Sequence, residues 1–338
     1  MSRHPGERPV SPPTRPPPGH QRRPLPLRVG TRGSALALTQ TRLFLARLTG
    51  FCPVLRDAEA FEEHPITTAG DRIADRRLAE IGGKGLFAKE IHEALLDRRI
   101  DFAVHSLKDL ETELPPGIVL ACCLAREDAR DALVLAPHCG PVDLGDPLSA
   151  IPPGGTVGTS SVRRAAQLLH RRPDLAVTLL RGNVGTRLAR VSAGEMDATL
   201  LAYAGLRRLG LEGAAAAVLD PEVMVPAAGQ GIVGVTVRED DTELRELLAA
   251  IEDPEAAAVS RAERALLAAL DGSCRTPIGG HAELRPDGTL RLVGLVASED
   301  GTFLLKRAIV GAPGDAVRLG RELGQSLRRD SPAAIFLG

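Results

Sequence analysis

The chain has 338 residues, of which 43% are hydrophobic and 25% charged, and its formal net charge at pH 7 is -1. This length exceeds what one hydrophobic core usually supports, so two or three domains are expected. Because the sequence has no long apolar run, we expect no membrane insertion, and the small net charge gives no global attraction for nucleic acid or anionic lipid.

The first 26 residues are rich in proline and arginine and contain no apolar stretch. This composition predicts a disordered tail over 1–26. An organellar transit peptide is the alternative, but the prolines disfavour the amphipathic helix that such a peptide needs. Ordered structure is expected to begin near Leu27.

From there the sequence alternates strand-like and helix-like segments. A β-rich run over 27–31 is followed by Ser34, which is placed to cap a helix over 35–48. Apolar residues at helical spacing then predict a helix over 86–99, and a buried strand over 101–105 comes next. This order is typical of an α/β domain.

Two short matches indicate an internal repeat. Val-Gly-Thr precedes a predicted helix at 29–31 and again at 157–159, and segment 100–103 resembles segment 196–199. The second unit is predicted to contain a strand over 156–159, a helix over 162–170 and a strand over 196–202. Two related α/β domains would place two helix N-termini across a shared cleft, where their positive dipole ends favour an anion.

The last third of the chain predicts a small α+β domain. It is expected to contain a helix over 255–270, a hairpin of strands over 290–297 and 302–310, and a closing helix over 315–328. Cys274 is expected on a loop after the first of these helices. A lone cysteine is more often inert, but nearby arginines would lower the pKa of its thiol and make it a usable nucleophile.

The cysteine and lysine contents set further limits. The five cysteines, at 52, 122, 123, 139 and 274, form no C-x-x-C pair and no His/Cys cluster with zinc spacing, so we expect no metal, no disulfide framework and a cytoplasmic location. Only 4 of the 42 basic residues are lysines, and three of them, Lys84, Lys89 and Lys108, lie close together. Codon bias with chance clustering is one explanation. A need for compact cations at Lys84 and Lys108 is the other.

Two glycine-rich segments resemble nucleotide-binding motifs but lack their context. Residues 229–234 have the letters G-x-G-x-x-G, yet a strand is predicted after them where a dinucleotide fingerprint needs a helix. Residues 82–85, Gly-Gly-Lys-Gly, lack the earlier glycine and the following Ser or Thr of a phosphate-binding loop. They are interpreted as a glycine loop that presents one cation at a helix start, or as a plain helix-entry turn.

The segment His105-Ser106-Leu107-Lys108-Asp109 ends a predicted strand, where open α/β sheets place ligands. An ion pair between Lys108 and Asp109 is one interpretation. The other is that adjacent residues of an extended segment point to opposite sides, so that Asp109 enters the cleft and stabilises a cation formed in a reaction. His105 is expected to be a packed strand residue rather than a base.

Two arginine-rich turns are the candidate anion sites. Arg163 and Arg164 lie in the first turn of a predicted helix, and Arg181 and Arg187 flank a glycine turn. Positive charge at a helix N-terminus opposes the helix dipole, so an anionic ligand is expected to offset this cost. A solvated basic face is the alternative.

Nine sequence blocks, taken together and in order, resemble the porphobilinogen deaminase family, also called hydroxymethylbilane synthase. The resemblance runs from about Leu27 to the C-terminus. The blocks are VGTRGSALALTQ (29–40), TTAGDR (67–72), GGKGLFAKEI (82–91), VHSLKD (104–109), REDARDAL (126–133), VGTSSVRRAAQL (157–168), LRGNVGTRL (180–188), PAAGQGIVGV (226–235) and DGSCRTPIGG (271–280).

The resemblance implies an α/β fold with two type II periplasmic-binding-protein-like domains and a small C-terminal α+β domain. The expected bounds are 27–125 with 232–250 for domain 1, 126–231 for domain 2 and 251–338 for domain 3. The implied activity is a transferase that condenses four porphobilinogen molecules head to tail into hydroxymethylbilane with release of ammonia, in tetrapyrrole (heme) biosynthesis. It implies a cytoplasmic monomer with no nucleic-acid or membrane partner. A two-domain carboxylate-binding receptor without chemistry is the alternative.

The resemblance also implies roles for individual residues. Asp109 is expected to be the catalytic carboxylate, and Cys274 is expected to carry a dipyrromethane cofactor through a thioether. The other residues expected to contact the cofactor are Lys84, Lys108, Asp109, Ser161, Arg163, Arg164 and Gly182. Those expected to contact the substrate are Arg32, Ser34, Gln40, Arg181, Arg187 and Gln230.

Two segments near Asp109 depart from the family pattern. Leu110-Glu111 stands where the family usually has a proline at the second position, and Leu124-Ala125 stands where Pro-Glu is commoner. Without the proline the loop is expected to be slightly looser, and Glu111 adds a negative charge near a site for anions.

Overall fold

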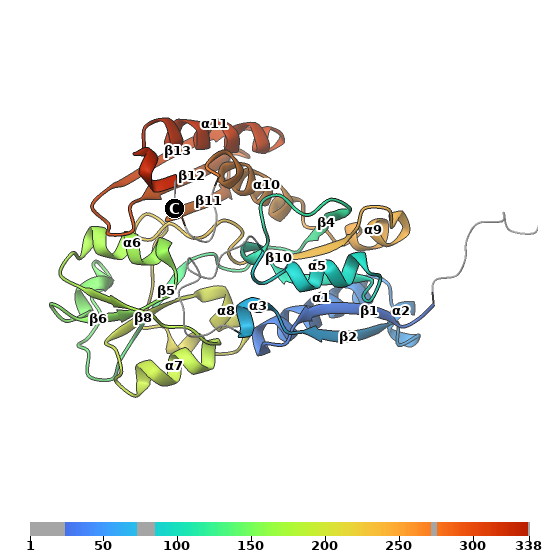
Figure 1. Ribbon diagram of the computed structural model, residues 1–338, viewed down its shortest axis with the longest axis horizontal. Helices are drawn as coiled ribbons and strands as arrows, with labels where there is room; N and C mark the ends of the chain where they lie inside the picture. Colours follow the sequence, from blue (N-terminus) through green and yellow to red (C-terminus); the bar gives the residue numbers. More distant parts are fainter. Residues whose placement is uncertain (1–23, 73–84, 272–275, 337–338) are drawn as a thin grey trace, which may run out of the picture.

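The computed structural model describes residues 24–72, 85–271 and 276–336. The tail predicted over 1–26 lies almost entirely outside the described residues, and so do Lys84 and Cys274. The described chain forms three lobes, each built around its own sheet (Figure 1). No helix in this part of the chain is long and apolar enough to cross a membrane.

The first lobe contains a five-stranded sheet of order β2-β1-β3-β10-β4. Strands β1, β2 and β3 are parallel, and β10 is antiparallel to both of its neighbours. The strands are β1 (Leu27–Arg32), β2 (Phe61–Ile66), β3 (Phe102–Ser106), β4 (Ile118–Cys123) and β10 (Val233–Arg238). The helices are α1 (Ala35–Phe51), α2 (Val54–Asp57), α3 (Ala69–Arg72), α5 (Lys89–Leu96) and α9 (Thr242–Ala249).

The second lobe contains a five-stranded sheet of order β7-β6-β8-β5-β9, in which β6, β7 and β8 are parallel and β5 is antiparallel to β8 and β9. Its strands are β5 (Asp131–Leu135), β6 (Thr156–Gly158), β7 (Ala176–Thr178), β8 (Ala198–Ala202) and β9 (Ala217–Val218). Its helices are α6 (Val162–Arg171), α7 (Val184–Ser192) and α8 (Tyr203–Arg208).

The two sheets confirm the internal repeat, because their orders coincide when β1, β2 and β3 are matched to β6, β7 and β8. Gly30 on β1 and Gly158 on β6 hold equivalent places against the next parallel strand. A Cβ at Gly30 would lie 2.2 Å from the side chain of Ile100, and one at Gly158 would lie 2.2 Å from that of Met196. In both lobes the missing side chain therefore lets the strand pack closely against the segment that enters its neighbour.

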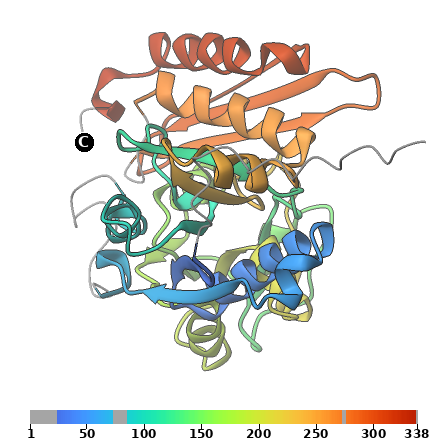
Figure 2. The ribbon, with the colours of Figure 1, turned by 90° about the vertical axis from the view of Figure 1, so that its right-hand side faces the viewer.

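The third lobe is the predicted small α+β domain. Strands β11 (Ile278–Leu284), β12 (Leu290–Ala297) and β13 (Leu304–Gly311) form an antiparallel sheet. Helices α10 (Pro254–Ala269) and α11 (Ala316–Arg329) lie side by side over one face of it (Figure 2). Leu266, Leu292 and Leu323 are buried in the core between helices and sheet. Apolar burial of this kind holds the lobe together.

Some element bounds differ from those predicted. The helix expected over 86–99 is shorter, because residues 86–88 form a turn before α5 and Arg98, with a left-handed φ of 56°, prevents the helix from continuing to 99. Strand β11 was not predicted, since Gly279 and Gly280 interrupt its β-rich pattern. Strand β8 begins at Ala198, two residues after the predicted start. These differences do not alter the order of elements.

Candidate active site

Asp109 lies just after β3, in the 3₁₀ turn Leu107–Asp109. The expectation of an extended segment here is wrong, but the side chains of Lys108 and Asp109 do face different partners. The Asp109 carboxylate lies 3.4 Å from the Arg32 guanidinium, whereas Lys108 Nζ donates a hydrogen bond of 3.2 Å to Gln230. The Asp109 side chain is 26% exposed, so a ligand can reach its carboxylate.

Arg32, at the end of β1, is held by two groups that the sequence did not single out. Its guanidinium donates two hydrogen bonds to the Asp71 carboxylate. It also lies over the Phe87 ring, 4.3 Å from the ring centroid, at a distance where a cation is attracted to the π face. Burial would raise the pKa of Asp71, but the bonds from Arg32 outweigh burial and lower it. Arg32 is therefore fixed beside Asp109 as a charged group.

Arg163 and Arg164 start α6, as predicted, but they are buried and share a protein carboxylate. Asp131, on β5, lies 2.8 Å from Arg163 and 2.7 Å from Arg164. Burial would raise the pKa of Asp131, but the two guanidiniums together lower it well below its usual range. The sequence analysis expected a ligand to offset the positive charge of Arg163 and Arg164. Part of that charge is offset within the protein by Asp131, which the sequence analysis did not identify.

Gln230 links the two lobes beside this cluster. Its side-chain amide donates to Asp131 at 2.8 Å and its oxygen accepts from Lys108. Its backbone lies in the glycine-rich segment before β10, where Gly231 has a φ of 89°. A Cβ at Gly231 would lie 2.2 Å from the carbonyl oxygen of Glu127, so only glycine permits this close approach of two backbones.

The electrostatics of the site favour anionic ligands. Burial and the charge of Arg164 lower the pKa of Lys108 to about 8. Burial and the charges of Arg164 and Arg181 lower the pKa of Arg187 to about 10. Both shifts show that cations crowd one another here despite Asp109 and Asp131. Carboxylates of a ligand would relieve that repulsion.

Two of the predicted contact residues already cap helices. The Oγ of Ser34 accepts from the Ala37 N–H at the start of α1, and the Oγ of Ser161 accepts from the Arg164 N–H at the start of α6. The equivalent caps in the two lobes leave each hydroxyl hydrogen available to donate to a ligand. Gln40 accepts from Ser106 at 3.0 Å, which places it beside the end of β3.

The turn before α7 brings the remaining arginines to the first lobe. Arg181 donates to the carbonyl oxygen of Gly70 at 3.0 Å, a contact between the two α/β lobes. Gly182 has a φ of 110°, and its carbonyl oxygen accepts from Arg187 at 2.8 Å. Left-handed backbone at Gly182 thus turns the chain so that both guanidiniums approach the same region.

His105 is a packed residue, as expected. It is buried on β3 and its Nε2 lies 2.9 Å from the Thr236 hydroxyl. Burial, with the nearby His92 and Arg32, lowers the pKa of His105 to about 3. The ring is therefore neutral at physiological pH and has no free access to a substrate.

The unusual Glu111 packs against α5 and the segment that precedes it. Its carboxylate occupies the space that a Cβ on Gly85 would need, and it lies 3.9 Å from the His92 ring. Arg264, on α10, donates to the carbonyl oxygens of Glu111 at 2.7 Å and Thr112 at 2.8 Å. A guanidinium from the third lobe therefore supports the loop that lacks the usual proline.

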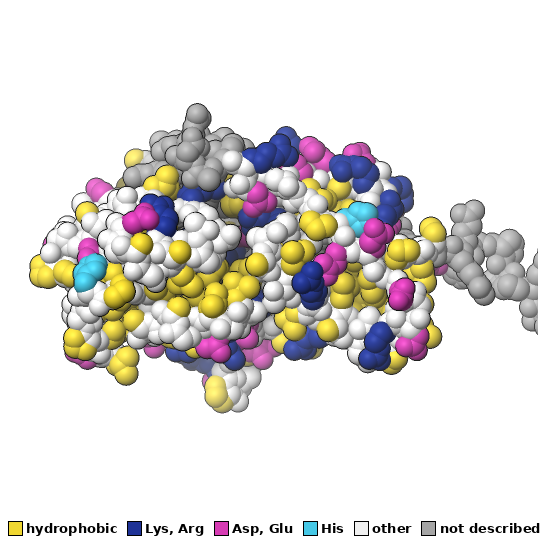
Figure 3. Space-filling view, turned by 90° about the horizontal axis from the view of Figure 1, so that it is seen from below, with side chains coloured by type: hydrophobic (Ala, Val, Ile, Leu, Met, Phe, Trp, Pro, Cys, Tyr) yellow, Lys and Arg dark blue, Asp and Glu magenta, His cyan; other side chains and the backbone are white. Residues whose placement is uncertain are grey.

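Acidic and basic side chains are interspersed over the face of the described residues seen in Figure 3, together with apolar ones. Such a mixed surface gives no long-range attraction for one sign of charge. Selectivity for an anion must then come from the cluster around Asp109 and Arg164, in agreement with the expectation from net charge.

Two family models match this chain. One described as "Porphobilinogen deaminase, dipyromethane cofactor binding domain" matches residues 27–246, and one described as "Porphobilinogen deaminase, C-terminal domain" matches residues 257–329.

Curated relatives named porphobilinogen deaminase match most of the chain. That of Syntrophobacter fumaroxidans is 46% identical over 89% of this chain and 94% of its own length, and that of Paracoccus denitrificans is 48% identical over 92% and 96%. Among solved structures, the VFT2 domain of BvgS from Bordetella pertussis is 16% identical and covers 70% of this chain and 92% of its own, with a TM-score of 0.38. A likeness that distant says nothing about activity.

Proposed function

This chain belongs to the porphobilinogen deaminase family, and we propose that Asp109 is the carboxylate on which its chemistry depends. The chain is a transferase that condenses porphobilinogen into hydroxymethylbilane with release of ammonia, in tetrapyrrole biosynthesis. The alternative of a receptor without chemistry is not favoured, because the curated relatives are named as enzymes.

The cofactor is dipyrromethane, the group for which the matched family domain is described. We propose Cys274, which lies outside the described residues, as its point of attachment. The crowded cations fit a group that carries carboxylates. When bound, the cofactor supplies the pyrrole carbon to which the first substrate is joined. The residues proposed to hold it are Lys84, Lys108, Asp109, Ser161, Arg163, Arg164 and Gly182.

The substrate is proposed to bind on the first-lobe side of Asp109. Arg32 is fixed there by Asp71 and Phe87, and its Nη1, which lies 3.4 Å from Asp109, is proposed to meet a substrate carboxylate. Loss of ammonia leaves positive charge on the substrate pyrrole. We propose that the Asp109 carboxylate stabilises that charge and accepts the proton released from the attacking pyrrole. The other residues proposed to contact substrate are Ser34, Gln40, Arg181, Arg187 and Gln230.

We further propose a cytoplasmic monomer whose domains span 27–125 with 232–250, 126–231 and 251–338. The sheet order supports the first division, because β10 returns to the sheet of β1 and β3. The four described cysteines are free thiols, which suits a reducing compartment.

The observation that carries the catalytic proposal is Asp109 beside a fixed Arg32, and two isosteric variants test it. We expect Asp109→Asn to lower kcat at least about 100-fold, since it removes the charge that stabilises the cation. The matched control is Asp71→Asn, which loosens Arg32 and should raise KM more than it lowers kcat. Near-normal kcat in Asp109→Asn, with its fold and cofactor mass intact, would remove Asp109 from the mechanism.

A further inference from the structure

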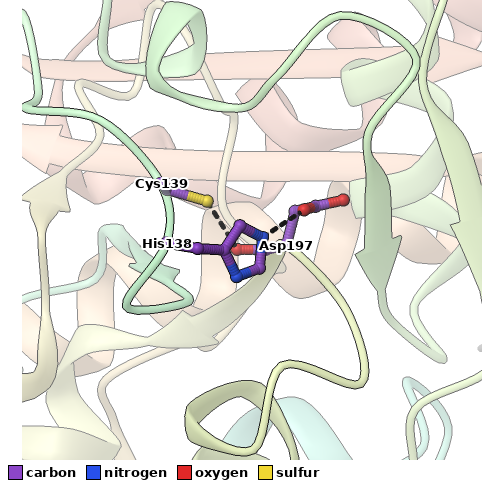
Figure 4. A group of neighbouring side chains, drawn as sticks. All are labelled: His138, Cys139 and Asp197. Carbon is purple, nitrogen blue, oxygen red and sulfur yellow. Dashed lines mark hydrogen bonds and ion pairs between the residues drawn. The ribbon is translucent and has the colours of Figure 1, made fainter.

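Three side chains with metal-binding atoms lie close together in the second lobe, away from the site around Asp109 and Asp131. His138 and Cys139 follow β5, and Asp197 immediately precedes β8 (Figure 4). One ligand atom from each, a ring nitrogen, the Sγ and a carboxylate oxygen, lies within 4.8 Å of the other two. His138 Nε2 is 2.7 Å from Asp197 Oδ1. The sequence showed no such cluster, because the third residue is far away along the chain.

Asp197 is also anchored by backbone groups outside this cluster. Its Oδ2 accepts the Thr156 N–H at 2.6 Å, and its own N–H donates to the Thr156 carbonyl oxygen at 2.9 Å. Its carbonyl oxygen accepts the Ala136 N–H at 2.7 Å. One carboxylate oxygen is thus fixed by the backbone while the other faces His138, so the ligand geometry is partly preorganised.

The internal repeat shows what differs at this position. In the first lobe the equivalent carboxylate is Asp101, which accepts the Arg28 N–H at 2.8 Å and also Nε and Nη2 of the Arg28 guanidinium, at 3.2 Å each. In the second lobe Thr156 stands in the place of Arg28 and brings no charge. The protein cation of the first lobe is therefore absent, and its place beside the carboxylate is taken by an imidazole and a thiol.

We propose that His138, Cys139 and Asp197 bind a zinc ion. Thiolate, imidazole and carboxylate are the donors that zinc takes, whereas magnesium and calcium prefer oxygen alone. The His138 side chain is 53% exposed, so the ion can enter from solvent and a water molecule can complete a tetrahedral shell. The Cys139 thiol donates to the Asp197 carbonyl oxygen at 3.3 Å, so zinc binding must displace that proton to solvent.

The position of the site predicts its role. Thr156 begins β6, whereas the Arg163 cluster follows the other end of that strand, so the ion would lie outside the carboxylate-binding region. A zinc ion there would join the chain after β5 to the start of β8. We therefore expect it to stabilise the second lobe and to leave turnover unchanged.

The test titrates the holoenzyme with Zn²⁺ by calorimetry and with Co²⁺ by absorbance. We expect one ion per chain, a thiolate-to-cobalt charge-transfer band and a higher melting temperature with Zn²⁺. Cys139→Ser should lose the band and bind Zn²⁺ at least about 10-fold more weakly, with unchanged kcat, and His138→Ala should weaken binding likewise. Cys52→Ser, at another partly exposed thiol, is the matched control and should bind as the parent does.

Two results would overturn the proposal. One is no stoichiometric binding of either ion by the parent. The other is binding that persists unchanged in Cys139→Ser and His138→Ala, which would place the ion elsewhere in the chain. Circular dichroism shows whether each variant is folded. Either variant alone can show the loss of zinc binding, so if one misfolds, the other still tests the proposal.

Discussion

Replacing Asp131 with asparagine tests whether this carboxylate compensates the charges of Arg163 and Arg164. Asp131 is fully buried and lies within 2.8 Å of the guanidiniums of both Arg163 and Arg164. Asparagine has the same shape and retains an oxygen that can accept from Gln230. The substitution therefore removes little except the negative charge between two buried cations.

The cost follows from that burial. Removing one partner of a buried ion pair leaves an uncompensated charge and typically costs about 3–5 kcal/mol. Here two guanidiniums lose the same carboxylate, and among the described residues their other hydrogen-bond partners are backbone carbonyls, that of Val225 for Arg163 and that of Leu200 for Arg164. We expect Asp131→Asn to lower the free energy of unfolding by about 3–5 kcal/mol.

Urea denaturation of the holoenzyme measures this loss. The control is Glu195→Gln, which breaks the exposed pair of Glu195 with Arg190 in the same lobe and should cost at most about 1 kcal/mol. If Asp131→Asn costs no more than the control, then Asp131 does not compensate the two guanidiniums and the electrostatic account of this cluster is wrong.

Three further outcomes are expected. His105 is buried with a pKa of about 3, against 6.5 when unfolded, so its protonation favours the unfolded chain as pH falls below 6.5. We expect this residue to lower the free energy of unfolding by about 2 kcal/mol between pH 7 and pH 5. Urea denaturation at both pH values should show a pH-dependent loss of stability that is smaller by this amount in His105→Gln. Gly231→Ala forces a Cβ against the backbone at a positive φ and should lower the free energy of unfolding by more than about 2 kcal/mol in urea denaturation. The added Cβ in Gly213→Ala would contact no other atom, so this control should be nearly neutral. Equal losses in the two variants would contradict the packing described for Gly231. Arg264→Met should lower the free energy of unfolding by about 2 kcal/mol, because a charged donor to the Glu111 carbonyl oxygen is lost. It should also lower kcat by loosening the turn that carries Asp109. Unchanged steady-state kinetics would show that the third lobe does not position that turn.

The parts of the fold that local signals specify were predictable from the sequence. Ser34 and Ser161 cap helices where a hydroxyl residue precedes an apolar helical pattern. The repeated Val-Gly-Thr segments identified two related lobes because glycine is needed at the same close contact in each, at Gly30 and Gly158. A cap can be recognised within a few residues, and the glycine from its position in a repeated segment, although the residues that it packs against, Ile100 and Met196, lie far along the chain.

The partners of the charged side chains were not predictable in the same way. Asp131 meets Arg163 and Arg164 only because β5 lies next to β8 in the sheet, an arrangement set by the whole lobe. Asp71 reaches Arg32 by the same kind of long-range packing. The sequence therefore indicated the arginines and Asp109, but not Asp131 and Asp71, the other carboxylates that pair with these arginines.

The turn at Asp109 shows a third kind of limit. An extended segment and a 3₁₀ turn differ mainly in ψ, by about 150° per residue, but here over only three residues, and no residue in the motif marks the change. The loop after Asp109 depends on remote contacts as well, since Arg264 of the third lobe holds the carbonyl oxygens of Glu111 and Thr112. The unusual Glu111 could be noticed in the sequence, but its place against Gly85 and His92 could not.

The most direct test of the account is the intact mass of the purified protein, followed by digestion to find which residue carries any added mass. We predict a mass greater than that of the polypeptide by two linked pyrrole units, all of it on Cys274. Active protein whose mass equals that of the polypeptide, or whose adduct lies on another residue, would contradict the claim that this chain builds its product on a sulfur-bound dipyrromethane.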